Sequence, residues 1–99
     1  MNSDIVSHSL RIPTEVAQLI RGLHPMFKKK VRAALTNIIG KPMCGKPLKE
    51  ELAGLRSYRL GKFRIVHRIA NERLIEIVAI GPRKNIYEET YRLVQRETR

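Results

Sequence analysis

The chain has 99 residues, of which 42% are hydrophobic and 29% charged, so residues 1–99 are enough for one globular domain and too few for two. Twenty lysines and arginines against nine aspartates and glutamates give a formal net charge of +11, and such a chain is expected to bind nucleic acid, an anionic membrane surface or an acidic protein. The single cysteine, Cys44, excludes an internal disulfide.

Several sequence features exclude other classes of protein. The N-terminal residues lack the basic and apolar segments of a signal peptide, which predicts a cytoplasmic protein. The longest apolar stretch, residues 74–80, is interrupted by Glu76 and is far shorter than the roughly 20 residues that span a bilayer. The three histidines are scattered along the chain and form no metal-ligand motif. We therefore expect no membrane contact, no metal and no other cofactor.

The N-terminal part of the chain predicts one strand and two helices. Residues 5–11 have extended character and end before a proline, because the residue that precedes proline avoids the helical region. Thr14 is a suitable N-cap for a first helix, and Pro25 suits the first turn of a second helix that ends at Gly40. Apolar residues at helical spacing support both helices. They are Val16, Leu19, Ile20 and Leu23 in the first helix and Phe27, Val31, Leu35 and Ile38 in the second.

The C-terminal part predicts three strands and a final helix. Two Gly-Lys-Pro triplets make residues 40–54 an ordered loop with room for one helical turn. Apolar runs at residues 55–60, 63–69 and 74–80 are separated by short turns, which is typical of an antiparallel meander. A helix that starts near Asn85 follows. The element order β-α-α-β-β-β-α predicts an α+β fold, in which the helices pack against one face of a small antiparallel sheet.

The first hairpin of the meander concentrates positive charge. If residues 60–63 connect its strands, Arg59 lies opposite Arg64, and both share a sheet face with Ser57 and Arg68. The opposite face then carries Tyr58, Leu60, Phe63, Ile65 and Ile69 toward the helices. Like charges opposite one another destabilise a strand pair, and arginine can donate two hydrogen bonds to one phosphate. This face is therefore either a phosphate-binding site or a solvated basic surface.

Three further features can be interpreted in two ways. Arg83 ends the last strand and Tyr87 lies in the first turn of the final helix, where free N–H groups favour anions; Tyr87 is either part of that site or an aromatic residue at the edge of the core. His67 alternates with apolar residues, so we expect it to be packed and hydrogen-bonded rather than catalytic. The second helix carries a basic cluster that is either a solvated face or a contact for RNA backbone. This cluster consists of Lys28, Lys29, Lys30 and Arg32.

Residues 45–69 and 75–83, together with Tyr87, resemble the RelE/ParE superfamily of toxin–antitoxin toxins. The most specific parts are Arg-x-Gly-x-aromatic-Arg at residues 59–64 and Arg-x-x-x-Tyr at residues 83–87. The resemblance implies a RelE-like fold and a toxin of the RelE branch. Such toxins are metal-independent endoribonucleases that cut mRNA in the ribosomal A site, inhibit translation and are silenced by a cognate antitoxin in a hetero-oligomeric complex.

The resemblance also implies the roles of the candidate site residues. Arg64 matches the arginine that contacts the scissile phosphate, and Arg83 matches the arginine that stabilises charge or assists the leaving group. Tyr87 matches the tyrosine near the target base or nucleophile. These three are the predicted catalytic residues. The residues predicted to bind RNA around them are Arg59, Lys62, Arg68 and Lys84.

One position departs from the family pattern. The best-known RelE has two lysines on the strand before the hairpin, where this chain has Leu55 and Ser57, so the general base is not identified. Arginine is a poor base, and Tyr87, Lys62, Lys84 and His67 stay open for this role. Two other functions also stay open: inhibition of DNA gyrase by a ParE-like toxin, and RNA binding without cleavage.

Overall fold

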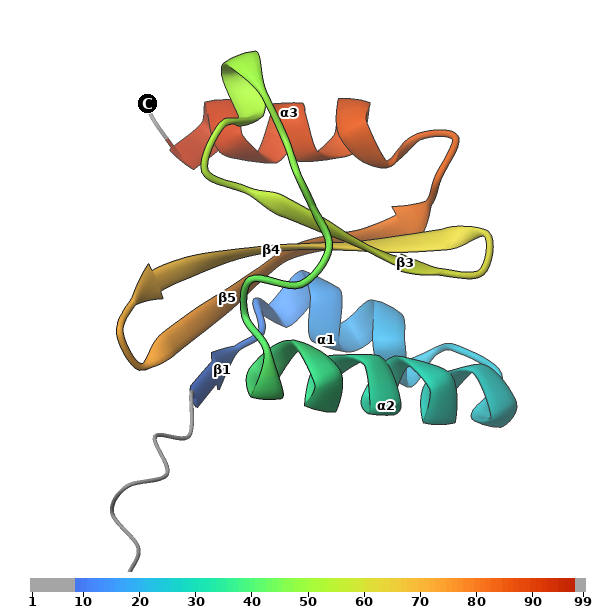
Figure 1. The fold of residues 1–99 in the computed structure, drawn as a ribbon. Helices are drawn as coiled ribbons and strands as arrows, with labels where there is room; N and C mark the ends of the chain where they lie inside the picture. The colour runs from blue at the N-terminus through green and yellow to red at the C-terminus, as the bar shows by residue number, and fades with distance from the viewer. Residues whose placement is uncertain (1–8, 98–99) are drawn as a thin grey trace, which may run out of the picture.

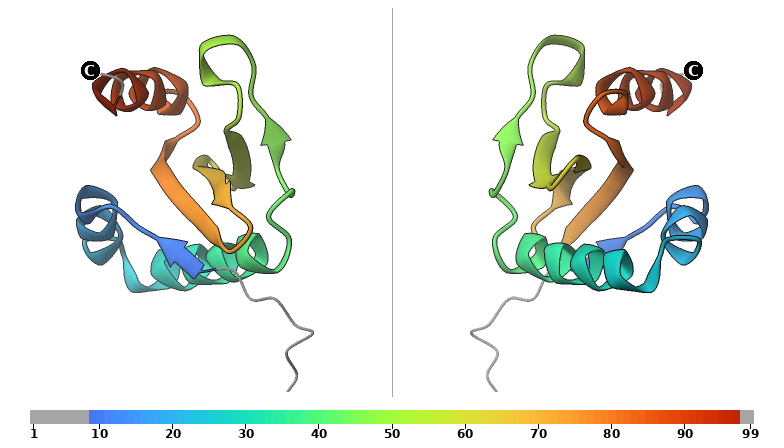
Figure 2. Two further views of the ribbon diagram at one scale, coloured as in Figure 1. Left: turned by 90° about the vertical axis from the view of Figure 1, so that its left-hand side faces the viewer. Right: turned by 90° about the vertical axis from the view of Figure 1, so that its right-hand side faces the viewer.

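The computed structural model describes residues 9–97, in which a mixed sheet lies between two helical layers (Figure 1). Helices α1 (Thr14–Arg21) and α2 (Pro25–Gly40) cover one face of the sheet, and α3 (Ile86–Glu97) lies on the other. The views in Figure 2 show this layered arrangement from both sides. The predicted α+β fold is confirmed, and the predicted strand at 5–11 lies partly outside the described residues.

The helical hairpin forms with the boundaries that its end residues favour. Pro25 begins α2, and the Nδ1 atom of His24 caps it by accepting a hydrogen bond from Met26 N at 3.1 Å. The expectation that Thr14 caps α1 is wrong, because Thr14 is the first residue of the helix and Pro13 is its N-cap. The carbonyl of Pro13 already accepts the first helical hydrogen bond, from Ala17 N at 2.9 Å.

The sheet has the strand order β1-β5-β4-β3-β2. Its strands are β1 (Ser9–Arg11), β2 (Lys46–Pro47), β3 (Arg56–Leu60), β4 (Phe63–Asn71) and β5 (Leu74–Pro82). The predicted meander of β3, β4 and β5 is confirmed. The sheet is mixed rather than purely antiparallel, because β1 pairs in parallel with β5. Parallel neighbours need a long connection, and the helical hairpin with the first two strands of the meander provides it.

The loop between α2 and β3 contains two short elements that hold it to the sheet. Strand β2 pairs with β3, and the 3₁₀ turn η1 (Glu50–Leu52) follows it, in agreement with the single turn expected in this loop. Gly45, just before β2, has a φ of 84°, and a Cβ atom there would lie 2.7 Å from the carbonyl oxygen of Ser57. Only glycine permits this close approach.

The core consists of two clusters, one on each face of the sheet. Ile65, Ile75 and Ile77 pack against α1 and α2, whereas Val66 and Val78 pack toward α3. The expectation that all helices cover one face is therefore wrong. The physical reason is that β5 is almost wholly apolar and needs cover on both faces. Most of the predicted inward face of the hairpin is confirmed, but Ile69, beside the β4–β5 turn, is 38% exposed.

Candidate functional site

The charged hairpin has the register expected from its sequence. Arg59 pairs with Arg64 and Ser57 pairs with Val66, so all four lie on the sheet face that carries α3. Leu60 still pairs with Phe63, which makes the connection a two-residue turn, residues 61–62, rather than four residues. The shorter turn leaves the predicted strand register unchanged, and Arg59 and Arg64 are directly opposite each other.

Three side chains from three different elements meet on this face. Ser57 of β3 is fully buried, and its hydroxyl oxygen accepts hydrogen bonds from Arg64 Nη1 at 3.3 Å and from the Tyr87 hydroxyl at 3.4 Å. Arg64 comes from β4, and Tyr87 comes from the first turn of α3. We refer to Ser57, Arg64 and Tyr87 as the site cluster. The Ser57 hydroxyl therefore links the Arg64 guanidinium to the Tyr87 hydroxyl.

Arg64 retains an unused donor inside the site cluster. Its Nε atom is shielded from solvent and has no hydrogen-bond partner among residues 9–97. The residue opposite it on β5 is Gly81, where a Cβ atom would lie 3.4 Å from the Cδ1 atom of Ile86 in α3. A shielded, unpartnered guanidinium N–H is costly, and an anion that accepts from it would remove that cost. The arrangement suits a phosphate group.

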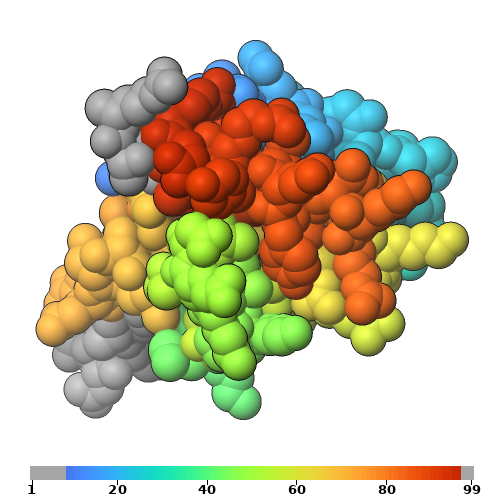
Figure 3. All heavy atoms as spheres, turned by 90° about the horizontal axis from the view of Figure 1, so that it is seen from above, coloured from blue at the N-terminus to red at the C-terminus, as the bar shows by residue number. Residues whose placement is uncertain are grey.

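Two basic turns lie side by side next to the site cluster. Arg83 N donates to the carbonyl oxygen of Lys62 at 2.8 Å, which joins the β3–β4 turn to the end of β5. Figure 3 shows the yellow atoms of the β3–β4 region beside the orange atoms that follow β5. The side chains of Lys62, Arg83, Lys84 and Arg59 are all exposed. Four of the predicted site residues are therefore gathered at one end of the sheet, where their charges can act on the same polyanion.

The sequence did not indicate two lysines that lie beside Tyr87. A hollow of about 290 Å³ is lined by Tyr87, Leu48, Leu52, Lys46, Lys49 and Pro47. Lys46 pairs with Ser57 across the β2–β3 ladder, which places it on the same face as the site cluster. The two Gly-Lys-Pro triplets are the sequence feature that could have indicated these lysines, but the triplets predict only a loop and not that the loop packs against β3.

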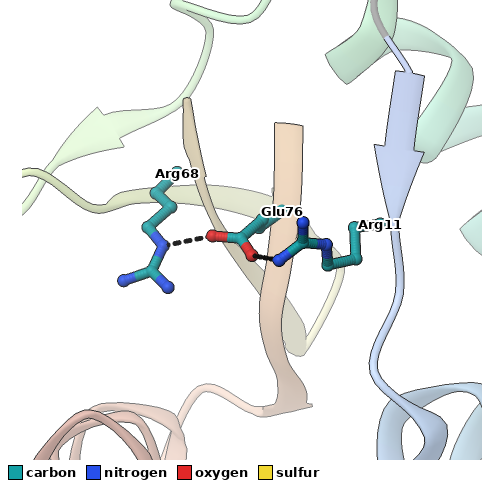
Figure 4. A network of polar contacts seen from close by, with 3 residues as sticks. All are labelled: Arg11, Arg68 and Glu76. Atoms are coloured by element: carbon teal, nitrogen blue, oxygen red, sulfur yellow. Dashed lines mark hydrogen bonds and ion pairs between the residues drawn. The ribbon is translucent and has the colours of Figure 1, made fainter. Parts of the chain in front are cut away.

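Arg68 lies on the predicted face but is held by a carboxylate away from the site cluster. Glu76 accepts hydrogen bonds from Arg68 Nε at 2.7 Å and from Arg11 Nη1 at 2.6 Å (Figure 4). The hydrogen bond from Arg68 is the main cause that lowers the pKa of Glu76 below its ordinary value. Arg68 thus connects β4 to β5, and Arg11 connects β1 to β5. The structure does not bring Arg68 together with Arg64, Arg83 and Tyr87.

His67 is buried on the other face of the sheet, as the packed interpretation predicted. Its Nε2 atom lies 3.0 Å from the carbonyl oxygen of Pro42, so Nε2 carries the proton. Burial lowers the pKa of His67, and its Nδ1 atom has no partner among the described residues. Its ring contacts the loop after α2 through Pro42, on the sheet face opposite the site cluster, which removes it from the candidates for the general base.

A larger groove lies beside the site cluster without including it. It has a volume of about 620 Å³ and runs between α1, β5 and α3. Its apolar lining includes Val16, Leu19, Ile80, Ile86 and Leu93. Arg96 Nη2 of α3 lies 3.6 Å from Glu15 Oε1 of α1, so a weak ion pair links the two helices beside it. Its charged lining includes Glu15, Glu76 and Glu89 as well as Arg68 and Arg96, so the groove offers less to a phosphate than the basic end of the sheet.

Residues 9–97 contain no group of three potential metal ligands. No helix in that part of the chain is both long and apolar enough to cross a bilayer.

Comparisons with known proteins agree with the fold. The model of a family described as the ParE toxin of the type II toxin–antitoxin system parDE matches residues 14–87. The toxin–antitoxin complex RelBE2 from Mycobacterium tuberculosis contains a chain 31% identical to this one, with a TM-score of 0.68; the match covers 79% of this chain and 100% of that one. A search of curated proteins finds no match.

Two further structures are similar in fold alone. A mutant of the Escherichia coli toxin RelE in the free state has 16% identity and a TM-score of 0.72, with 91% of this chain and 97% of that chain covered. YafQ from E. coli has 14% identity and a TM-score of 0.62, with 81% of this chain and 98% of that chain covered.

The family model and the chain of 31% identity show that this chain belongs to the RelE/ParE superfamily. It is a toxin of a type II toxin–antitoxin system with a RelE-like fold.

Proposed function

We propose that this toxin is an endoribonuclease of the RelE branch that cuts mRNA on the ribosome in the cytoplasm and so inhibits translation. The site cluster is the observation that carries the proposal. It places a guanidinium with an unused, shielded donor beside a tyrosine hydroxyl, at the basic end of the sheet.

The reaction that suits this site is attack by the 2′-hydroxyl of RNA on the adjacent phosphorus. A bond forms between O2′ and phosphorus, the bond from phosphorus to O5′ breaks, and the products carry a 2′,3′-cyclic phosphate and a 5′-hydroxyl. One proton leaves the 2′-hydroxyl and one is gained by O5′, so the charge balances. Catalysis requires alignment, proton transfer and stabilisation of the extra negative charge on the phosphate.

The side chains of the site have distinct roles in this proposal. Arg64 donates to the non-bridging oxygens of the scissile phosphate, and Arg83 stabilises charge on the leaving-group side. Arg59, Lys62 and Lys84 bind the flanking backbone. Tyr87 lies where it can exchange a proton or hold the base. With His67 on the far face of the sheet, the candidates for the proton acceptor are Tyr87, Lys62 and Lys84.

The test is induction of the chain in growing cells, followed by primer extension on translated mRNA. Cleavage is expected with the unchanged chain and is expected to fall by about a hundredfold or more with Arg64→Ala. DNA breaks trapped on gyrase are measured in the same cultures. Intact transcripts together with such breaks would assign the toxin to a different target and refute the proposal.

A second function is favoured by one specific observation. The family model that matches this chain is described as that of the ParE toxin, and ParE-like toxins inhibit DNA gyrase by binding it. The same induction experiment separates the two functions. Intact RNA and intact DNA together with RNA binding would instead indicate a module that binds RNA without cutting it.

We also propose an acidic, amphipathic antitoxin segment as the inhibitor. Its carboxylates pair with the basic end of the sheet, and its apolar side packs on the helical hairpin and fits the groove between α1, β5 and α3. Since it binds only the folded toxin, it raises the stability of the toxin in the hetero-oligomeric complex by about 2.7 kcal/mol at a hundredfold excess over Kd. Association is expected to slow markedly as salt is raised.

A further inference from the structure

Helix α2 carries a basic surface that the proposed function does not use. We call Lys28, Lys29, Lys30 and Arg32 the α2 basic face. Lys29, Lys30 and Arg32 are exposed, and Lys28 is half-buried. Helix α2 contains no acidic residue, and among residues 9–97 none of these four cations forms an ion pair. Four uncompensated charges within five residues repel one another, and a bound polyanion removes that repulsion.

The α2 basic face is placed on the opposite side of the sheet from the site cluster. α2 packs with the cluster that contains Ile65 and Ile77, whereas Ser57 and Arg64 lie on the face of α3. A short RNA segment in the site therefore cannot contact α2 directly. Any RNA bound at both places has to pass around an end of the molecule.

The connection between the two surfaces is the end that contains the β3–β4 turn. The first turn of α2 is fixed to the start of β4, because the rings of Phe27 and Phe63 pack edge to face with centroids 4.8 Å apart. Lys62 lies in the β3–β4 turn, directly before Phe63, and its carbonyl oxygen accepts the hydrogen bond from Arg83 N. Figure 1 shows the N-terminal end of α2, the β3–β4 turn and the β5–α3 connection at the same end of the molecule. Cations thus continue from the site around this end to α2.

The composition of the α2 basic face indicates nucleic acid rather than protein as its ligand. The exposed residues of α2 between positions 29 and 37 are Lys29, Lys30, Arg32, Ala33, Thr36 and Asn37. None of these six has a large apolar side chain, and the one large apolar residue exposed on α2 is Met26 in its first turn. The centres of protein interfaces are enriched in aromatic residues and depleted of lysine. Lysine acts on phosphate as a mobile point charge without reading the sequence.

We propose that the α2 basic face binds the backbone of RNA that extends from the cleavage site around the β3–β4 turn. The inference rests on the proposed function in taking RNA as the ligand. It adds that the toxin binds a longer RNA than the cut segment, through contacts that take no part in the chemistry. The α2 basic face then raises affinity for long RNA and leaves the affinity for a short RNA unchanged.

The test measures binding of the full-length chain to uncleavable 2′-O-methyl RNA at several salt concentrations. The long probe has about 20 nucleotides, more than the roughly 4–16 that one basic groove covers, and the short probe is a pentanucleotide. Lys29→Gln, Lys30→Gln and Arg32→Gln are combined in one variant. Because each phosphate contact on a single strand contributes about −0.7 to the slope of log K against log salt, the slope for the long probe is expected to become less steep by about 2.

Two matched variants control for net charge. One removes three exposed cations elsewhere, as Lys41→Gln, Arg73→Gln and Arg92→Gln, and is expected to keep the original slope. The other exchanges the cations as Lys29→Arg, Lys30→Arg and Arg32→Lys, and is expected to restore binding. The pentanucleotide is expected to bind all variants equally. Because the probes cannot be cut, these results do not depend on whether the chain is a nuclease.

Three outcomes would overturn the inference. The inference, but not the proposed function, is overturned if the α2 variant keeps the salt slope of the unchanged chain on the long probe. It is also overturned if the variant with cations removed elsewhere loses as much of that slope as the α2 variant does. Normal RNA binding together with lost affinity for an acidic helical peptide shows that the face contacts a protein. If the unchanged chain binds neither RNA probe, the inference fails, whereas the proposed nuclease function is decided separately by the primer-extension experiment on translated mRNA.

Discussion

Ser57→Ala tests whether the buried hydroxyl organises the catalytic side chains. The substitution removes one oxygen atom that accepts from Arg64 and from Tyr87. Ser57 is fully buried, and alanine fits the same space. Without the hydroxyl, Arg64 and Tyr87 are no longer held to each other, and we expect RNA cleavage to slow while the fold stays intact.

The magnitude follows from the two contacts. A hydrogen bond to a charged group contributes about 1.5–3 kcal/mol and a neutral one about 0.5–1.5 kcal/mol. At 3.3 and 3.4 Å, both contacts are longer than the usual distances, so the lower ends apply. The combined loss is about 2 kcal/mol, which is about thirtyfold in rate. In an Arg64→Ala background only the contact with Tyr87 is left, and Ser57→Ala should then cost about twofold.

The assay is the rate of mRNA cleavage in a cell-free translation reaction, measured by primer extension, with the melting temperature measured in parallel. Thr90→Val is the matched control, because Thr90 is also fully buried and its hydroxyl donates to Ile86 O at 2.6 Å outside the site cluster. This control should lose stability and keep its cleavage rate. An equal, thirtyfold effect of Ser57→Ala with and without Arg64 would refute the reasoning.

Three further predictions concern single residues. Arg64→Ala and Arg83→Ala should each lower the cleavage rate by about a hundredfold or more while the protein stays folded, since each removes a preorganised donor at the phosphate; full activity in either contradicts its role. Tyr87→Phe keeps the ring and removes the hydroxyl, and unchanged cleavage by this variant would leave stacking as its role. Glu76→Gln should lower the free energy of unfolding at neutral pH by about 2 kcal/mol, mostly through Arg68 Nε because the other partner is largely exposed. The lowered pKa of Glu76 means that this contribution is complete above the unfolded-state pKa and is lost as pH falls through the folded-state pKa. Denaturant titrations of the two proteins should therefore converge at acidic pH, below the folded-state pKa. Glu89→Gln, in an exposed pair at 3.5 Å, should change little at neutral or acidic pH.

Local sequence signals determined most of the elements. Apolar residues at helical spacing, with a proline at the start and a glycine at the end, fix α2 as residues 25–40. The short turn at residues 61–62 sets the hairpin register, so the pairing of Arg59 with Arg64 could be worked out from alternation alone. Both results depend on contacts between residues that are close in the chain.

Contacts between distant segments were decided only by the tertiary structure. The parallel pairing of β1 with β5 joins residues more than sixty positions apart, and no local pattern specifies that partner. The position of α3 on the second face depends on the apolar surface that β5 presents there. The site cluster combines both effects, because Tyr87 reaches Ser57 only after α3 has packed on that face. Lys46 joins the same face because Gly45 allows β2 to approach β3 closely. The sequence thus determined which side chains could bind phosphate, and long-range packing determined which of them meet.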